Sequence, residues 1–285
     1  MSADQAGRTF VITGANSGIG KAAAKALAER GAHVVLAVRD VAKGKEAAAA
    51  MTGEPEVREL DLSDLGSVHA FAKAWDAPLD VLINNAGIMA VPQGTTKDGF
   101  ELQIGTNHLG HFALTNLLLP QITDRVVTVA SGAHRAGSVN LDDLNWEHRR
   151  YDRWRAYGQS KLANLLFTLE LEKRLSEAGS ELRATAAHPG WTATNLQSHT
   201  ENWLQNAFMA IGNKVIAMDE DGGAAPTVYA ATEDIPGNSY VGPDGFQEMR
   251  GFPTLVGRTP AAADPELARR LWEESAALTG VNFPD

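Results

Sequence analysis

The chain has 285 residues, no cysteine, a formal net charge of −10 at pH 7 and a hydrophobic content of 44%. The lack of cysteine excludes disulfides, thiolate catalysis and zinc–thiolate sites, and the acidic balance argues against a nucleic-acid partner. No apolar run is long enough to span a membrane and the first ten residues carry no export signal, so the sequence predicts one large cytoplasmic α/β domain over residues 1–285.

The first predicted element is a β-rich run, Thr9 to Thr13, which ends at a glycine loop. An alanine-rich helical pattern follows the loop and ends at Gly31. Strand, glycine loop and helix in this order favour a phosphate-binding loop over an ordinary turn, because glycine allows close backbone approach and the helix N-terminus offers N–H groups. The loop residues expected to bind a dinucleotide are Gly14, Asn16, Ser17, Gly18, Ile19 and Gly20.

The second predicted strand, His33 to Val38, ends at Arg39. An enzyme selective for NAD carries a carboxylate near this point for the ribose 2′-hydroxyl, whereas arginine offers a planar set of donors suited to a phosphate. We therefore expect NADP(H) as the cofactor. The alternative is a solvated arginine paired with Asp40.

Two further strands bring polar or small residues to the same edge of the predicted sheet. Val57 to Leu60 is followed by Asp61 and Leu62, where the carboxylate could meet the adenine amino group or cap the next helix, with Ser63 as a competing cap. Val81 to Ile83 runs into Asn84, and then into Asn85, Ala86 and Gly87. Small residues at the carboxyl end of a parallel strand leave room for a ligand.

Tyr157 and Lys161 lie four residues apart in a helical pattern, so their side chains share one helix face. A tyrosine pKa near 10 is too high for ready proton exchange at neutral pH, and a nearby ammonium is expected to lower it. The pair is a candidate general acid and base for a carbonyl or alcohol oxygen.

Taken together, these motifs resemble the short-chain dehydrogenase/reductase family. The matching elements are TGANSGIG at Thr13 to Gly20, NNAG at Asn84 to Gly87, Asn107, Ser131, Tyr157 with Lys161, and Pro189-Gly190, in the family's order. The resemblance implies a doubly wound, Rossmann-type, mostly parallel sheet of seven strands with helices on both faces. The spacing of the glycines is similar to that of the short single-domain members and disfavours a nucleotide-sugar epimerase.

The resemblance also implies roles for individual residues. Tyr157 is the proton donor, Lys161 lowers its pKa and binds the nicotinamide ribose, and Ser131 holds the substrate oxygen. Asn107 holds a water that leads protons away from Lys161. Pro189, Gly190, Thr192 and Thr194 belong to the segment that contacts the nicotinamide carboxamide and the diphosphate.

The resemblance is strongest to retinol-dehydrogenase-like and protochlorophyllide-reductase-like members. Ser131 and Tyr157 are 26 positions apart, a wider separation than is common in the family, which indicates an insertion at about 139–155. Apolar residues at helical spacing between Asn202 and Met218 indicate either a substrate lid, over about 194–218, or a helix packed on the core. Asp264 and Pro265 predict a closing helix that ends at Gly280.

The sequence thus predicts hydride transfer between NADP(H) and an apolar carbonyl or alcohol, with a non-catalytic NADP(H)-binding redox sensor as the alternative. No metal is expected, because His108 and His111 have no carboxylate partner at metal-site spacing. A homo-oligomer stays open: the apolar runs Leu109 to Leu118 and Leu162 to Leu175 could pair between subunits, and the insertion could block that face.

Overall fold

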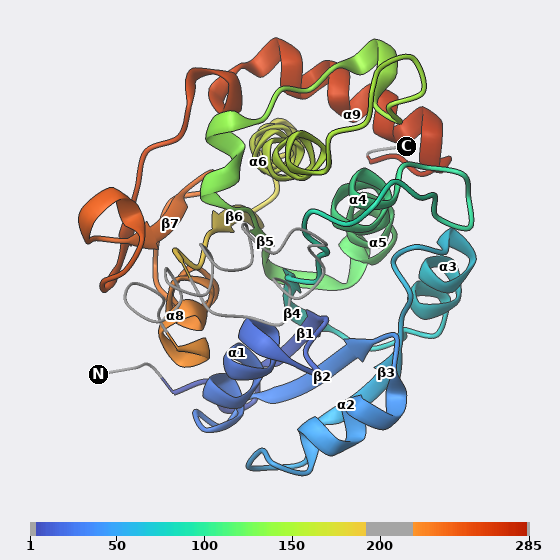
Figure 1. Ribbon diagram of the computed structural model, residues 1–285. Helices are drawn as coiled ribbons and strands as arrows, with labels where there is room; N and C mark the ends of the chain where they lie inside the picture. The colour runs from blue at the N-terminus through green and yellow to red at the C-terminus, as the bar shows by residue number, and fades with distance from the viewer. Residues whose placement is uncertain (1–3, 192–218, 284–285) are drawn as a thin grey trace.

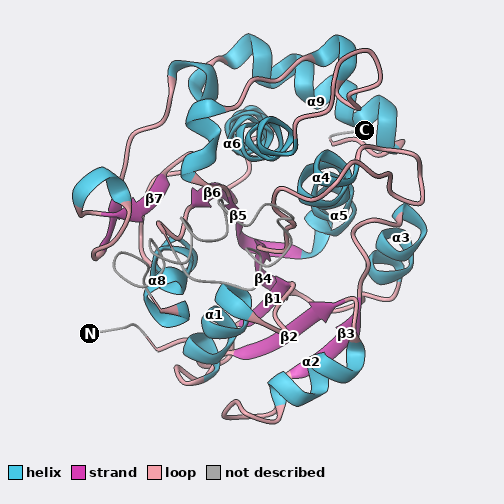
Figure 2. Ribbon diagram, in the orientation of Figure 1, coloured by secondary structure: helices cyan, strands magenta, loops and turns pink. Residues whose placement is uncertain are grey.

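The centre of the molecule is one mixed sheet, seen in the computed structural model, which describes residues 4–191 and 219–283 (Figures 1 and 2). The strand order is β3-β2-β1-β4-β5-β6-β7-β8. The strands are β1 (Thr9–Thr13), β2 (His33–Val38), β3 (Glu56–Glu59), β4 (Leu79–Asn84), β5 (Ile122–Val129), β6 (Arg183–Ala187), β7 (Tyr240–Pro243) and β8 (Pro253–Leu255). Strands β1 to β7 are parallel to one another and β8 is antiparallel to β7.

The sheet has eight strands where the sequence predicts seven. The additional strand, β8, pairs with β7 in the register Val241 to Leu255 and Gly242 to Thr254. It is three residues long, begins with a proline and lies half-buried or exposed at the sheet edge. So short and exposed a segment has no apolar run by which the sequence could reveal it.

Helices cover both faces of the sheet, which confirms the doubly wound fold class (Figure 1). Within β1, Phe10 and Ile12 face one helical layer and Val11 faces the other, as the period of two in a strand requires. The first layer contains α1 (Gly18–Ala28), α2 (Val41–Ala48) and α8 (Glu220–Thr232). The second layer contains α3 (Leu65–Lys73), α4 (Leu102–Ile104), α5 (Gly110–Leu118), α6 (Arg153–Glu177) and α9 (Pro265–Thr279).

Short helical turns fill several of the connections. They are η1 (Gly105–Leu109), a π-helical turn between α4 and α5, and the 3-10 turns η2 (Leu119–Gln121), η3 (Gly132–Ala136), η4 (Leu141–Asp143), η6 (Phe246–Glu248) and η7 (Pro260–Ala263). The predicted insertion at about 139–155 therefore contains η4 and the first turn of α6.

The chain changes direction across the sheet between β1 and β4. The first three strands extend toward one edge, whereas β4 returns beside β1 and the later strands extend toward the other edge. In open α/β sheets a ligand binds outside the carboxyl ends of the strands at such a reversal. The glycine loop after β1 and the Asn85 to Gly87 segment after β4 both lie at this point.

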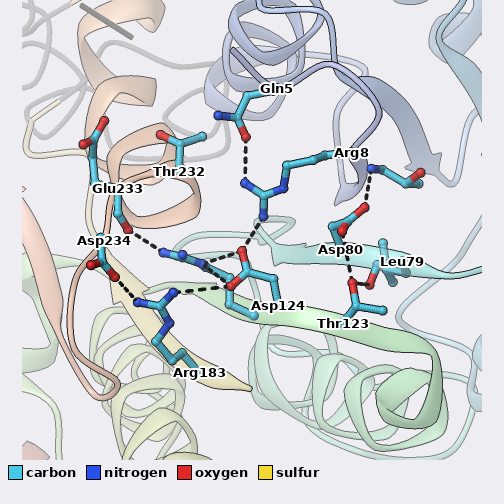
Figure 3. A network of polar contacts seen from close by, with 12 residues as sticks. Gln5, Arg8, Leu79, Asp80, Thr123, Asp124, Arg183, Thr232, Glu233 and Asp234 are labelled. Atoms are coloured by element: carbon cyan, nitrogen blue, oxygen red, sulfur yellow. Dashed lines mark hydrogen bonds and ion pairs between the residues drawn. The ribbon is translucent and has the colours of Figure 1, made fainter. Parts of the chain in front are cut away.

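A network of ion pairs lies at the opposite edge of the sheet, where the parallel strands begin (Figure 3). The Asp124 carboxylate at the start of β5 pairs with the guanidinium of Arg8, with Arg125 Nε at 3.1 Å and with Arg183 Nη2 at 3.7 Å. Arg183 also contacts Asp234 at 2.6 Å. One carboxylate thus ties the start of β1 to β5 and β6.

The closing helix α9 confirms its predicted boundaries. The Asp264 side chain accepts from the backbone N–H groups of Glu266 and Leu267, at 2.9 and 3.1 Å, and Gly280 ends the helix at φ +68°. The predicted lid over 194–218, with Thr192 and Thr194, lies outside the described residues. None of the helices in the described ranges has both the length and the apolar composition needed to cross a membrane.

Candidate active site

A cavity of about 650 Å³ lies at the carboxyl ends of the strands and brings together nearly all the predicted site residues within the described ranges. Residues from both halves of the chain share its wall, from Gly14 near the start of the chain to Met249 between β7 and β8. Those predicted from the sequence are Gly14, Asn16, Ser17, Gly18, Ile19, Gly20, Arg39, Asp61, Leu62, Asn85, Ala86, Gly87, Ser131, Tyr157, Lys161, Pro189 and Gly190.

The glycine loop packs too closely against the segment after β4 to hold side chains. A Cβ atom at Gly20 would lie 2.3 Å from Asn85 Nδ2, and one at Gly14 would lie 2.9 Å from Ala86 Cβ. Gly14 also has a φ of +67°, which favours glycine. Ser17 is the N-cap of α1, but its side chain makes no capping hydrogen bond, so the first N–H groups of α1 stay available to an anion.

Thr13 and His111 hold this loop to the neighbouring segment, a role that was not predicted from the sequence for either residue. The Thr13 hydroxyl oxygen accepts from the backbone N–H groups of Asn85 and Ala86, both at 2.9 Å. His111 Nδ1 donates to the Asn107 carbonyl at 3.0 Å, so its Nε2 accepts from the Thr13 hydroxyl at 2.9 Å. The position of Thr13 directly before the first glycine was the available signal.

Arg39 lines the cavity and forms no ion pair with Asp40, contrary to the alternative considered for it. Asp40 instead caps α2 by accepting from Lys43 N at 3.1 Å, a hydrogen bond that lowers the pKa of the Asp40 carboxyl, and its carboxylate lies 3.5 Å from Lys43 Nζ. Lys43, in the first turn of α2 and four residues after Arg39, also lines the cavity and was not predicted from the sequence. Two cations therefore lie at this end.

Asp61 lines the cavity and does not cap α3. Its carboxylate accepts from the backbone N–H of Ser63 at 2.9 Å and from the Ser63 hydroxyl at 2.6 Å. The α3 cap is Asp64, which accepts from Gly66 N at 2.9 Å, so neither of the two caps considered from the sequence is used. Asp61 therefore keeps its carboxylate at the cavity wall.

Tyr157 and Lys161 lie one turn apart on α6, and both are buried in the protein. Lys161 Nζ lies 5.8 Å from the centre of the Tyr157 ring and donates to the Val129 carbonyl at 3.0 Å. Burial lowers the Lys161 pKa to about 8.

The predicted lowering of the Tyr157 pKa is not found. Burial raises the pKa of Tyr157, and the hydrogen bond with Ser131 lowers it by a smaller amount. The cost of desolvating a phenolate dominates, because the Lys161 ammonium is directed at a backbone carbonyl. Ser131 reaches Tyr157 from the loop after β5 through this hydrogen bond, and its role in holding a substrate oxygen stays a prediction.

Asn107 does not line the cavity and is fully buried in η1, behind Gly87 and Ile88. Its side chain accepts from Ile88 N at 2.8 Å and donates to Ile88 O and to Ser160 Oγ, both at 2.9 Å. Through these contacts the Asn107 side-chain amide holds the backbone of Ile88 in the cavity wall against α6. Its role in holding a water stays a prediction.

Five further residues line the cavity, and no role was predicted for them from the sequence. Trp154, one turn before Tyr157 on α6, and Met89 contribute apolar surface. Arg135, His188 and Glu248 contribute polar groups from three different loops. The fold brings these five residues from separate loops and from α6 to one cavity.

Fold and site together define a dinucleotide-dependent oxidoreductase, and comparisons with known proteins agree. The sequence profile of the short chain dehydrogenase family matches residues 8–205. Retinol dehydrogenase 13 from Homo sapiens is 41% identical over 98% of this chain and 86% of its own length. The chain belongs to the short-chain dehydrogenase/reductase family and is of the retinol-dehydrogenase-like kind.

Two solved structures are similar to this chain over most of its length. An uncharacterized protein from Mycobacterium paratuberculosis is 55% identical, with a TM-score of 0.87 over 100% of this chain and 97% of that one. A protein from Beutenbergia cavernae, described as an NAD(P)-dependent gluconate 5-dehydrogenase with NADP bound at low occupancy, is 27% identical, with a TM-score of 0.61 over 80% of this chain and 90% of that one.

Proposed function

We propose that the protein transfers a hydride between NADP(H) and an apolar carbonyl compound or the corresponding primary or secondary alcohol. The observation that carries the proposal is the single cavity that joins the glycine loop and Arg39 to Tyr157 and Ser131. A dinucleotide lying along this wall would have its phosphates at the N-terminus of α1 and its other end beside Tyr157.

The choice of NADP(H) over NAD(H) rests on Arg39 and Lys43. Two cations at the end of β2 suit a 2′-phosphate, and Arg39 is not neutralised by Asp40. The Beutenbergia cavernae relative described with bound NADP supports the same choice. Gly14, Asn16 to Gly20, Asp61, Leu62, Asn85 to Gly87, Pro189, Gly190, Thr192 and Thr194 are the other residues that we propose to hold the cofactor.

The chemistry follows from the groups around Tyr157. Bound NADPH would supply the hydride. Tyr157 would donate its proton to the carbonyl oxygen while the Ser131 hydroxyl holds that oxygen, and in the oxidation direction Tyr157 would take the proton back. Lys161, with a pKa of about 8, keeps most of its positive charge at pH 7 and would bind ribose hydroxyls.

An apolar substrate is supported by Trp154 and Met89 at the cavity wall and by the names of the relatives. Trp154 is 37% exposed, so its ring is accessible to a ligand held at Tyr157. The relatives named retinol dehydrogenases act, by that name, on a large apolar alcohol. We propose a substrate of similar size and polarity.

The experiment that tests this function measures coenzyme consumption with a panel of retinoids, steroids, aldehydes and ketones, for the parent and for Tyr157→Phe. We expect the parent to use NADPH in preference to NADH and Tyr157→Phe to lose activity by a factor of at least about 100, because the phenol is the only proposed proton donor. Binding of NADPH to both proteins, followed by fluorescence, shows whether the variant keeps its site. Turnover that survives in Tyr157→Phe would remove the tyrosine from this role.

The alternative is a redox sensor of the same fold that binds NADP(H) without turnover. NADPH binding with no consumption of any compound in the panel would favour it. The presence of Tyr157, Lys161 and Ser131 in one cavity favours the enzyme.

Three further expectations from the sequence stay proposals. We propose that residues 1–285 form a single Rossmann-type domain with an insertion at about 139–155, that the protein is cytoplasmic, and that it can form homo-oligomers. Limited proteolysis, cell fractionation and light scattering, respectively, test these three points.

A further inference from the structure

Three polar side chains connect the loops at the ends of β5, β6 and β7 beside the cavity. Arg135 lies in η3, four residues after Ser131. His188 follows β6 and directly precedes the Pro189–Gly190 turn, and Glu248 lies in η6, between β7 and β8. All three side chains line the cavity.

Their contacts form one continuous chain from the Ser131 loop to the Gly190 backbone. Arg135 Nη2 donates to Glu248 Oε1 at 2.6 Å, and His188 Nε2 contacts Glu248 Oε2 at 3.0 Å. Gly190 N lies 3.2 Å from His188 Nδ1. A backbone N–H can only donate, so Nδ1 is the acceptor, Nε2 carries the ring proton, and that proton is donated to Glu248.

Tyr240, on β7, supports the same two loops through its ring. The His188 and His134 ring centres lie 5.1 and 5.7 Å from that of Tyr240, and His134 Nδ1 donates to the Ser131 carbonyl at 2.7 Å. Space around His188 is tight, because a Cβ atom at Gly242 would lie 2.1 Å from His188 Nε2. The imidazole is therefore held in one orientation.

The backbone that presents Glu248 is strained. Gln247 and Glu248 have φ values of +50° and +56°, which side-chain-bearing residues rarely adopt. The next residue accepts a hydrogen bond through its carbonyl, from Trp191 N to Met249 O at 2.8 Å. Strain of this kind persists where the surroundings require one geometry, and it concentrates at functional sites.

We propose that Glu248 is a positioning residue that fixes the Ser131 loop and the Pro189–Gly190 turn relative to each other. The proposal rests on the proposed function, in which the Ser131 loop holds the substrate oxygen and the turn forms the coenzyme wall. Glu248 acts through Arg135 on one side and through His188 on the other. A displacement of about 1 Å between reacting groups can lower a rate by about 100-fold, so this connection affects the rate more than it affects binding.

The test compares Glu248→Gln, Arg135→Gln and the double variant with the parent in the full-length protein. Glutamine keeps the shape of the side chain, but it has one acceptor oxygen and cannot accept hydrogen bonds from both Arg135 and His188. Glu266→Gln is the matched control, because Glu266 also pairs with an arginine, Arg269 at 2.7 Å, but lies on α9 away from the cavity. The measurements are kcat and KM for the best carbonyl of the panel, the emission of bound NADPH, and the thermal midpoint.

We expect Glu248→Gln to lower kcat by about 10- to 100-fold with little change in KM, to change the emission of bound NADPH, and to keep a thermal midpoint close to that of Glu266→Gln. The double variant should lose no more than the more affected single variant, since both act through one contact. Glu248→Asp keeps the carboxylate and should recover part of the lost rate.

A kcat of Glu248→Gln within twofold of the Glu266→Gln control, or additive losses in the double variant, would overturn the proposal. If Glu248→Gln does not fold, Arg135→Gln decides, because the Arg135 side chain is 44% exposed and its loss leaves little unfilled volume. If the parent turns over no carbonyl, the proposed function fails on its own, and an unchanged NADPH emission in Glu248→Gln would then overturn the positioning role as well.

Discussion

Burial sets the charge of two histidines, His108, which contacts α9, and His111, which contacts the glycine-loop residue Thr13. His108 and His111 are both fully buried, and burial lowers their pKa values from 6.5 to about 3 and about 4, respectively. His108 Nε2 contacts Ser275 Oγ at 2.8 Å, and His111 accepts from Thr13. Both rings are therefore neutral in the folded protein at physiological pH, and His111 needs to be neutral in order to accept.

A loss of stability on mild acidification follows from these two residues. The unfolded chain takes up protons on both histidines as pH falls through 6.5, whereas the folded protein does not until about pH 4. Between pH 6.5 and 5 each residue should lower the free energy of unfolding by about 1.5 kcal/mol. Urea unfolding at several pH values measures this slope. A free energy that stays constant over this window would contradict neutral, buried imidazoles.

Arg39 should determine which coenzyme is preferred. Replacing it by alanine removes a donor to the proposed 2′-phosphate, and a hydrogen bond between charged groups of this kind corresponds to a change in binding of roughly 10- to 100-fold. We expect Arg39→Ala to weaken NADPH binding by that factor and to leave NADH binding unchanged. Arg30→Ala, in the half-buried turn after α1 and outside the cavity, is the control. Equal weakening of both coenzymes would mean that Arg39 does not contact the phosphate.

At the scale of the element, α6 is the helix on which the site depends. It runs for 25 residues from Arg153 to Glu177, and sixteen of them are buried, so packing on both sides fixes its axis. Because Tyr157 and Lys161 project from one face of this rigid helix, their separation does not depend on any loop. The helix begins only four residues before Tyr157, so the position of Tyr157 depends on an intact first turn.

The cap of α6 should contribute measurably to stability. Asp152 accepts from the backbone N–H groups of Trp154 and Arg155, both at 3.0 Å. Asp152→Ala removes both bonds and should cost about 1 kcal/mol, whereas Asp152→Asn keeps an acceptor and should cost much less. Thermal unfolding of the two variants provides the comparison. Equal midpoints for alanine and asparagine would show that the cap contributes nothing.

At the scale of the whole molecule, the carboxyl ends and the amino ends of the parallel strands carry different features. The carboxyl edge carries the cavity, and the opposite edge carries the ion-pair network around Asp124 (Figure 3). In that network the buried Arg125 guanidinium donates to the carbonyls of Ala230 and Glu233, at 3.1 and 2.7 Å, at the C-terminus of α8. The network thus holds α8 against β5 at the edge away from the cavity.

Removal of Arg125 should therefore lower stability without a direct effect on the site. Arg125→Met leaves Asp124 and the two α8 carbonyls without this donor, and should lower the free energy of unfolding by roughly 2–4 kcal/mol. NADPH binding at 25 °C should match that of the parent. Arg269→Met, in an exposed ion pair on α9, is the control and should unfold as the parent does. If Arg125→Met changes the free energy of unfolding as little as Arg269→Met does, the network does not stabilise the fold.

Strands that local sequence patterns indicate lie close to their predicted positions. The strands Thr9–Thr13 and His33–Val38 have the predicted bounds, the third strand is shifted by one residue to Glu56–Glu59, and the fourth, Leu79–Asn84, is longer than predicted. The edge strand β8 was missed because three half-exposed residues carry no periodic signal. The direction of the Tyr157 pKa shift was also wrong, because burial cannot be read from a motif.

The sequence by itself determined the order of strands and helices, the glycine loop and the spacing of Tyr157 and Lys161, since these depend on residues within one or two turns of each other. Only the tertiary structure joined Arg135 to Glu248 across 113 positions. It also showed that Asn107 lies behind the cavity wall. Contacts of that kind depend on the path of the whole chain, and no local pattern encodes that path.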